Sequence, residues 1–331
     1  MLLGVGVSLV AVYLIISQMR DNDLGLIGEA LRSARYPYVA LSALIIAAGL
    51  FARGARWRAL LSGGLPFWRA FSINNVAYLI NGLVPFRIGE LARAYLATRA
   101  KPPVPALKSL STIVVERLLD VLAVLVILLL ALSQGPLPEE LRAVSLVLAP
   151  AALIGFLALV LLSSQRRFVL RVFDAISARV SILARLNARA AVEHVFDGIK
   201  PLAQPAALVQ TLLLTAVSWV CSVVSGYVLM LAFFPQADWG TTLMFTAMAS
   251  LAVAVPAVPG NLGTYELSIL LALQAMGWGE PAAIAGAFAV TVHAVNLIIN
   301  AGMGVVGFVQ EGVSLQQLSQ GVSEIRRNSL G

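Results

Sequence analysis

Long, continuous apolar runs separated by short polar stretches make up most of the chain. A helix needs ~20 consecutive apolar residues to cross a bilayer, and several runs reach or approach that length. The runs do not alternate between apolar and polar residues as the strands of a membrane barrel do, so they predict helices. The predicted helices cover about residues 2–17, 38–53, 70–84, 88–98, 110–133, 143–164, 206–234, 241–258, 263–277 and 281–310.

The fold class predicted from these runs is an all-α polytopic membrane protein with about seven to eight transmembrane helices. Three predicted helices, at 70–84, 88–98 and 263–277, are too short for a full crossing and are interpreted as half-helices or re-entrant segments. We expect one transmembrane domain over residues 1–315 and a short cytoplasmic tail at 316–331.

Composition limits the chemistry that this chain can perform. Of the 331 residues, 60% are hydrophobic and only 12% are charged, which is about half the charged share of a soluble protein. One cysteine and two histidines exclude a disulfide framework and a metal centre built from Cys or His. We therefore expect no metal and no cofactor.

The basic residues indicate how the chain is oriented in the membrane. They lie mainly in polar stretches between the apolar runs, so the net charge of +7 indicates topology and not binding of nucleic acid. Most of them fall in the connections 53–69, 87–108 and 166–200, which the positive-inside rule places in the cytoplasm. Both termini are then cytoplasmic, in a bacterial-type inner membrane. For this to hold, 70–84 and 88–98 must together form a re-entrant hairpin.

The long connection 166–200 combines basic side chains with apolar ones. Two interpretations stay open: an amphipathic helix on an anionic membrane surface, or an ordinary cytoplasmic loop with helical stretches.

Two short segments, Val84–Leu91 and Val258–Leu267, resemble each other. Each places a glycine four residues after a proline, with an aliphatic residue just before that glycine and a Glu-Leu pair after it. The preceding helices enter from opposite sides of the membrane, so the pattern predicts inverted repeats with broken helices at about 38–133 and 206–310. A chance similarity of short motifs is the alternative. The residues expected to break the helices are Pro85, Gly89, Pro259, Gly260 and Gly263.

A helix break of this kind can form a binding site for an anion. Proline removes a backbone donor and glycine permits unusual dihedral angles, so the helix unwinds. The helix that starts after the break presents free N–H groups and the positive end of its dipole. Arg87 and Asn261 lie in the two breaks, and Glu90 and Glu266 follow them, where each would cap N–H groups or pair with a basic residue.

Glu116, Arg117 and Asp120 open the apolar run that ends near residue 133. Glu116 and Asp120 are four residues apart and share a helix face. The three charges would either lie at the membrane interface or pair, in a central cavity, with charges near the first break. Those partners would be Arg87, Glu90 and Arg93.

Uncharged polar residues also occur within the apolar runs. His293, Asn296 and Asn300 form one stripe along the last predicted helix, and Asn81 lies just before the first break. Such a stripe either joins neighbouring helices by hydrogen bonds or lines a polar pathway. A separate cluster that includes Arg56 and Trp57 ends the second predicted helix, where tryptophan beside arginine is typical of interfacial anchoring.

Taken in order, four motifs resemble the lysylphosphatidylglycerol synthase transmembrane-domain family, which includes the flippase half of the multiple peptide resistance factor proteins. The motifs are Arg56-Trp57-Arg58, Asn81–Glu90 with Arg93, Glu116–Asp120, and Pro259–Gly263 with Glu266. The resemblance covers about residues 1–315 and implies a lipid-translocating domain with re-entrant helices. Nothing after residue 315 is long enough for the cytosolic aminoacyl-transferase domain, so lipid aminoacylation is not implied.

The leading hypothesis is a flippase-like transporter, and not an enzyme, for an anionic or amphiphilic membrane lipid. Arg87, Arg93 and Arg117 would meet the phosphate of the headgroup in a central cavity. The balancing acidic residues would be Glu90, Glu116, Asp120 and Glu266. No G-x-x-x-x-G-K-[ST] motif is present, so transport would use a gradient. A homo-oligomer is left open.

Two alternatives belong to other functional classes. Asp21-Asn22-Asp23 after the first predicted helix resembles the acidic pair of membrane glycosyltransferases that use polyprenyl-phosphate donors, although the large external loops of such enzymes are missing. A non-transporting lipid-binding scaffold is the other.

Overall fold

A computed structural model of the chain describes residues 8–13, 23–84, 88–133, 139–177, 188–253, 259–314, 316–321 and 323. Within these ranges all regular structure is helical. Residues 8–13 are helical, and the later elements are α2 (Asp23–Ser33), α3 (Tyr36–Leu60), α4 (Phe67–Leu83), α5 (Gly89–Thr98), α6 (Ala106–Leu132), α7 (Glu139–Ser164), α8 (Arg166–Ser177), α10 (Ala188–Ile199), η1 (Lys200–Ala203), α11 (Pro205–Phe233), α12 (Trp239–Ala252), η2 (Pro259–Asn261), α13 (Thr264–Ala275) and α14 (Ala282–Glu311).

Proline and glycine set several of the helix boundaries. Pro37 and Pro205 lie in the first turns of α3 and α11, where a missing N–H leaves no intrahelical bond unmade. Gly312 ends α14 in the left-handed conformation, with φ 61°. The apolar runs predicted α3 and α6 too short, because α3 continues through arginines to Leu60 and α6 begins at Ala106 in a polar stretch. The prediction missed α2.

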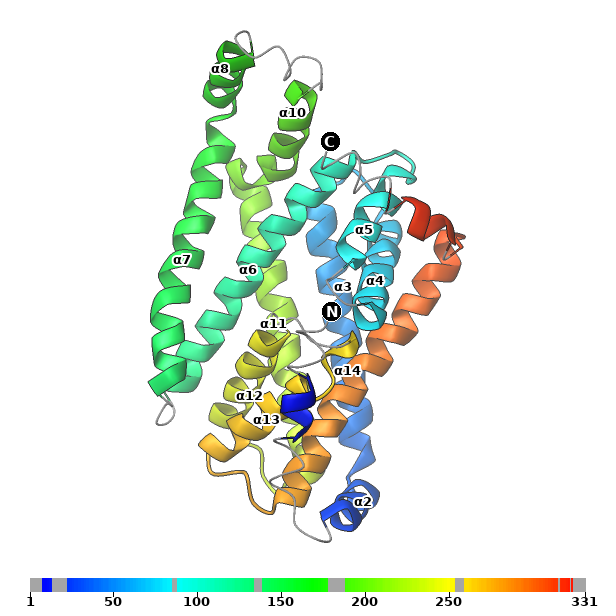
Figure 1. Cartoon of the computed structure of the whole chain (residues 1–331), viewed down its shortest axis with the longest axis vertical. Helices are drawn as coiled ribbons and strands as arrows, with labels where there is room; N and C mark the ends of the chain where they lie inside the picture. Colours follow the sequence, from blue (N-terminus) through cyan, green and yellow to red (C-terminus); the bar gives the residue numbers. More distant parts are fainter. Residues whose placement is uncertain are drawn as a thin grey trace.

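The molecule has two halves along its long axis, and the short helices are distributed between them. Helices α3, α11 and α14 extend over much of that dimension, whereas α4 and α5 lie in one half and α12 and α13 in the other (Figure 1). The first half also holds α8 and α10, and the second holds α2.

Helix contacts repeat between the first group, α3 to α6, and the second group, α11 to α14. Helix α3 packs along α11. Helix α4 packs on α14 just as α12 packs on α6, and the pairs α4–α5 and α5–α6 have counterparts in α12–α13 and α13–α14. Each short helix pair therefore fills one half of the molecule, between the long helices of both groups.

Three helices in the described part of the chain, α3, α11 and α14, are long and apolar enough to cross a membrane. A fourth candidate is the pair Leu153–Ser164 and Arg166–Ala175, which is bent by 78°. Helix α6 has 27 residues, about 40 Å of helix, but it carries three charged residues near its middle. The chain is thus a multi-pass helical membrane protein, and the total of seven to eight crossings stays a prediction.

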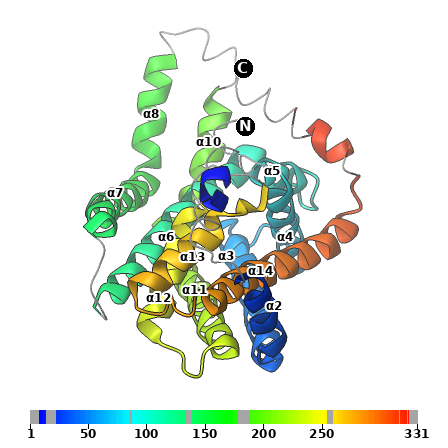
Figure 2. The same cartoon turned by 60° about the horizontal axis from the view of Figure 1, so that its bottom comes forward.

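The connection 166–200 contains two separate helices. Helix α8 exposes Phe168 and Val172, and together with α7 it lies at one margin of the molecule (Figure 2). Helix α10 packs on α6, where Phe196 is buried and a Cβ built on Gly198 would overlap the Ser111 hydroxyl. The α10 half of this connection is therefore anchored to the helix bundle.

Candidate functional site

A buried network of charged side chains joins α3, α5 and α6 near the middle of α6. Glu116 on α6 accepts a hydrogen bond from Arg93 on α5, with 2.6 Å between Oε2 and Nη1. Its other oxygen lies 3.5 Å from Nε of Arg56 on α3. All three side chains are at most 2% exposed, so the two arginines share one carboxylate in the protein interior.

Asp120, one helical turn further along α6, extends this network toward α11. Arg56 Nη1 donates to Asp120 Oδ1 over 2.7 Å, and the indole N–H of Trp219 on α11 donates to the same oxygen over 3.2 Å. Arg117 Nη1 lies 3.6 Å from Asp120 Oδ2. Asp120 therefore couples α3, α6 and α11 through one carboxylate.

The pair of Arg117 and Glu90 forms the accessible edge of the network. Arg117 Nε lies 3.4 Å from Glu90 Oε1 at the start of α5. The two side chains are 36% and 25% exposed, in contrast to the enclosed pair Arg93–Glu116. Pairing with charges near the first break was one of the two interpretations of these residues, and the structure pairs Glu116 with Arg93 and Arg117 with Glu90.

Trp57 and Arg56 are core residues, and their predicted role as interfacial anchors is wrong. Trp57 is 0% exposed, its indole N–H donates to Thr112 over 3.1 Å, and its ring lies 4.0 Å from the guanidinium carbon of Arg93. The pattern was misread because α3 was expected to end at residue 53. The signal that could have located Arg56 is that α5 and α6 carry three acidic residues but only two arginines.

The first break is described only at its two flanks, in α4 and α5, because Pro85 and Arg87 lie outside the described residues. The backbone N–H of Gly89 donates to Asn81 Oδ1 over 2.9 Å. A Cβ built on Gly89 would overlap the carbonyl oxygen of Ala77. Glycine is thus required here by the close approach of α5 to α4, and not by an unusual dihedral angle as predicted.

The second break has the unusual backbone that its sequence predicted. Gly260 and Gly263 adopt φ values of 73° and 84°, and Asn261 adopts 56°. Glu266 Oε2 accepts a hydrogen bond from the N–H of Gly263 over 2.8 Å, which caps α13. A Cβ built on Gly260 would lie 3.7 Å from the carbonyl oxygen of Gly82. The second break therefore lies against the end of α4.

A second buried polar cluster follows this break. His293 Nδ1 on α14 lies 2.7 Å from Glu266 Oε1, and the two side chains are 5% and 13% exposed. The ring of Tyr265 stacks on the imidazole at 4.5 Å. The other members of the predicted stripe, Asn296 and Asn300, donate to carbonyl oxygens one turn back on α14 itself.

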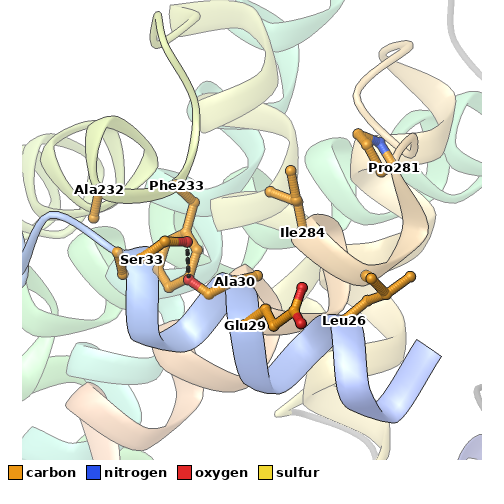
Figure 3. A pocket seen from close by; sticks show the side chains of 10 residues that line it. Leu26, Glu29, Ala30, Ser33, Ala232, Phe233, Pro281 and Ile284 are labelled. Atoms are coloured by element: carbon orange, nitrogen blue, oxygen red, sulfur yellow. Dashed lines mark hydrogen bonds between the residues drawn. The ribbon is translucent and has the colours of Figure 1, made fainter. Parts of the chain in front are cut away.

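Two surface pockets lie away from these clusters. One, of about 340 Å³, lies between α2, the end of α11 and the start of α14, and Glu29 is its one charged lining residue (Figure 3). The other, of about 300 Å³, is lined by Pro66, Arg69, Arg99 and Lys101. The first has no cation to receive a phosphate. The second has three cations but lies at the start of α4 and the end of α5, whereas the charge network lies among apolar helices, so the network is the better candidate site. Asp21 lies outside the described residues, and Asp23 begins α2.

The family model for the lysylphosphatidylglycerol synthase TM region matches residues 1–304. The chain belongs to this family. The match includes both breaks, the charge network and the Glu266–His293 pair, and it indicates a membrane role related to lipids. Comparisons with curated proteins and with solved structures give no match.

Proposed function

We propose that this member of the lysylphosphatidylglycerol synthase TM region family is a flippase-like transporter, without enzymatic activity, that moves an anionic phospholipid across the membrane. The observation that carries the proposal is the charge network around Glu116, which lies inside a bundle of apolar helices and has one accessible edge. Charges at such depth are costly and mark substrate pathways in membrane proteins.

The physical task of such a transporter is to lower the cost of moving a headgroup through hydrocarbon. A phosphate without partners pays a large desolvation penalty in an apolar medium. Arg117 and Glu90 form a partly exposed pair that a headgroup can exchange with, the phosphate taking the place of Glu90 on Arg117. The enclosed Arg93–Glu116 pair holds α5 against α6 while this exchange occurs. Arg87, beside the first break, would supply a further cation.

The pairing of the helices supports an inverted repeat of α3–α6 and α11–α14. A two-fold axis in the membrane plane would relate α4 to α12 and α6 to α14, so that each contact of one repeat has a counterpart in the other. In this arrangement α4–α5 and α12–α13 are re-entrant hairpins from opposite sides, and the two breaks meet where Gly260 approaches Gly82. Transport would follow from rocking one repeat against the other.

The test is movement of fluorescent phospholipids in vesicles that contain the purified protein. We expect faster movement of an anionic lipid such as phosphatidylglycerol than in protein-free vesicles, and at least about a tenfold loss with Arg117→Gln, because a charge-assisted contact to phosphate is removed. Arg189→Gln is the matched control, since Arg189 pairs with carboxylates on an exposed surface of α10.

Each result decides between hypotheses. If wild-type protein moves no lipid, the proposal fails and the scaffold hypothesis stands. If Arg117→Gln and Arg189→Gln retain equal rates, lipids move but not through the network.

A further inference from the structure

Arg53 lies on α3, one turn before Arg56 of the charge network. Among the described residues it has no ion pair and no hydrogen bond. Its guanidinium carbon instead lies 5.9 Å from the ring centroid of Tyr78 on α4 and 5.8 Å from that of Trp219 on α11. Aromatic faces attract a cation but do not neutralise it. Arg53 therefore keeps its charge and its five N–H donors for another partner.

The neighbouring charges balance without Arg53. Three arginines of the network are matched by three carboxylates through the ion pairs described above. Those residues are Arg56, Arg93 and Arg117, with Glu90, Glu116 and Asp120. Glu266 is already engaged by His293 and by the N–H of Gly263. Among the described residues, Arg53 is thus a positive charge without a paired carboxylate, and such an arginine in an apolar helix requires an anion or water.

Arg53 lies next to the charge network. The Trp219 ring that its guanidinium faces donates its indole N–H to Asp120 Oδ1 over 3.2 Å. The side chain is partly exposed, unlike Arg56 one turn later. Arg53 is therefore a partly exposed cation beside Tyr78 of α4 and Trp219 of α11.

Tyr78 supplies a second donor at the same place. Its hydroxyl accepts a hydrogen bond from Asn74 over 3.4 Å and donates to none of the described residues. The Tyr78 ring thus lies beside the Arg53 guanidinium, and its hydroxyl has a proton to donate.

We propose that Arg53 and the Tyr78 hydroxyl form the phosphate-binding site for the lipid headgroup, with the Trp219 ring positioning the guanidinium. Guanidinium groups bind phosphate oxygens through parallel, charge-assisted hydrogen bonds, and the ligand class is a phosphate mono- or diester anion. This inference rests on the proposed function, because it names the residues that hold the substrate of the same transporter.

The test is equilibrium binding to detergent-solubilised full-length protein, measured by the shift of the unfolding midpoint as ligand is added. The probes are dioctanoyl phosphatidylglycerol and inorganic phosphate. We expect wild-type protein to be stabilised in a saturable way by the lipid, Arg53→Gln to raise its dissociation constant at least about tenfold, and Arg53→Lys to give an intermediate value. Arg58→Gln is the matched control, because Arg58 is exposed on the same helix and should leave binding unchanged.

The two probes separate the sources of the phosphate. If inorganic phosphate shifts the unfolding midpoint and Arg53→Gln abolishes this shift, the site binds the anion alone. If only the lipid shifts the midpoint, the acyl chains or the glycerol contribute to binding. Equal lipid affinity of Arg53→Gln and wild-type protein overturns the inference. If Arg53→Gln does not fold, unchanged affinity of Arg53→Lys and of Tyr78→Phe overturns it instead.

Failure of this inference is distinguishable from failure of the proposed function. If lipid binding depends on Arg53 but no lipid moves in vesicles, the binding site is supported and the transporter function is contradicted. If lipid moves and the rate of Arg53→Gln equals that of wild type, the transporter function is supported and the binding site is contradicted.

Discussion

Glu116 joins two arginines of the network, and its loss should destabilise the fold. It is the shared partner of Arg56 and Arg93, and none of the three is more than 2% exposed. A buried carboxylate between two guanidinium groups is stable because each charge replaces the water that the others have lost. Removing one partner leaves the remaining charges desolvated and unmatched.

We predict that Glu116→Gln destabilises the protein by about 3–5 kcal/mol, because it leaves Arg93 buried without a carboxylate. The unfolding midpoint in detergent measures this loss. Glu193→Gln is the control: Glu193 pairs with Arg189 on the surface, and such a pair contributes under ~1 kcal/mol. Equal shifts for the two variants would contradict the structural role of the network.

At the residue scale, sequence reasoning identified the right acidic groups and only part of their partners. Glu116 and Asp120 were recognised as two carboxylates on one helix face, and Arg93 as a partner. Arg56 was missed, because a basic residue near the expected end of an apolar run has the same local pattern whether it anchors at an interface or enters the core. Its burial depends on α5 and α6, which are distant in sequence.

At the scale of helices, glycines decide how closely neighbours approach. In α14, a Cβ on Gly304 would overlap Leu79, and one on Gly307 would lie 2.7 Å from the carbonyl oxygen of Ser72, so α14 packs directly on α4. Gly302, on the same helix, has no neighbour within 4 Å and takes no part in this packing.

The first break offers a matched pair of substitutions. We predict that Gly89→Ala costs about 1–3 kcal/mol, since the added methyl group would overlap the Ala77 carbonyl and force α5 away from α4. Gly82→Ala should be neutral or stabilising, because nothing lies within 4 Å of the added atom and alanine is the better helix former. Unfolding midpoints of the two variants in the same detergent check this, and a larger loss for Gly82→Ala would refute it.

At the scale of the whole molecule, the half that holds α8 and α10 should face the cytoplasm. The basic pocket lined by Arg69, Arg99 and Lys101 lies at the start of α4 and the end of α5, in that same half. The orientation follows from the positive-inside rule, since the opposite connections carry few basic residues.

Cysteine labelling tests this orientation. In a Cys221→Ser background, Gln236→Cys in the α11–α12 connection should react with a membrane-impermeant maleimide on intact spheroplasts. Lys101→Cys in the α5–α6 connection should react only after the membrane is opened. Both residues are exposed, so accessibility reports the side of the membrane. The reverse labelling would invert the topology, and labelling of both in intact spheroplasts would contradict the three crossings by α6, α7 and α11 that the topology places between them.

The sequence by itself determined where the main helices run and where two of them break. Apolar runs, prolines and glycines act locally, so residues near one another in the chain were enough to place α11, α14 and the Pro259–Gly263 break. The same local signals indicated that the charges of α6 would need partners, because an isolated charge in an apolar helix is unstable.

Only the tertiary structure decided which partners those charges have. Arg56 and Arg93 lie 60 and 23 positions from Glu116 in the chain, and Trp219 lies 99 positions from Asp120. Such pairs form when helix packing brings side chains within hydrogen-bonding distance, and no local pattern encodes that distance. The missing ion pair of Arg53 could be recognised only in the tertiary structure for the same reason. It becomes evident once the ion pairs of the neighbouring arginines and carboxylates are known.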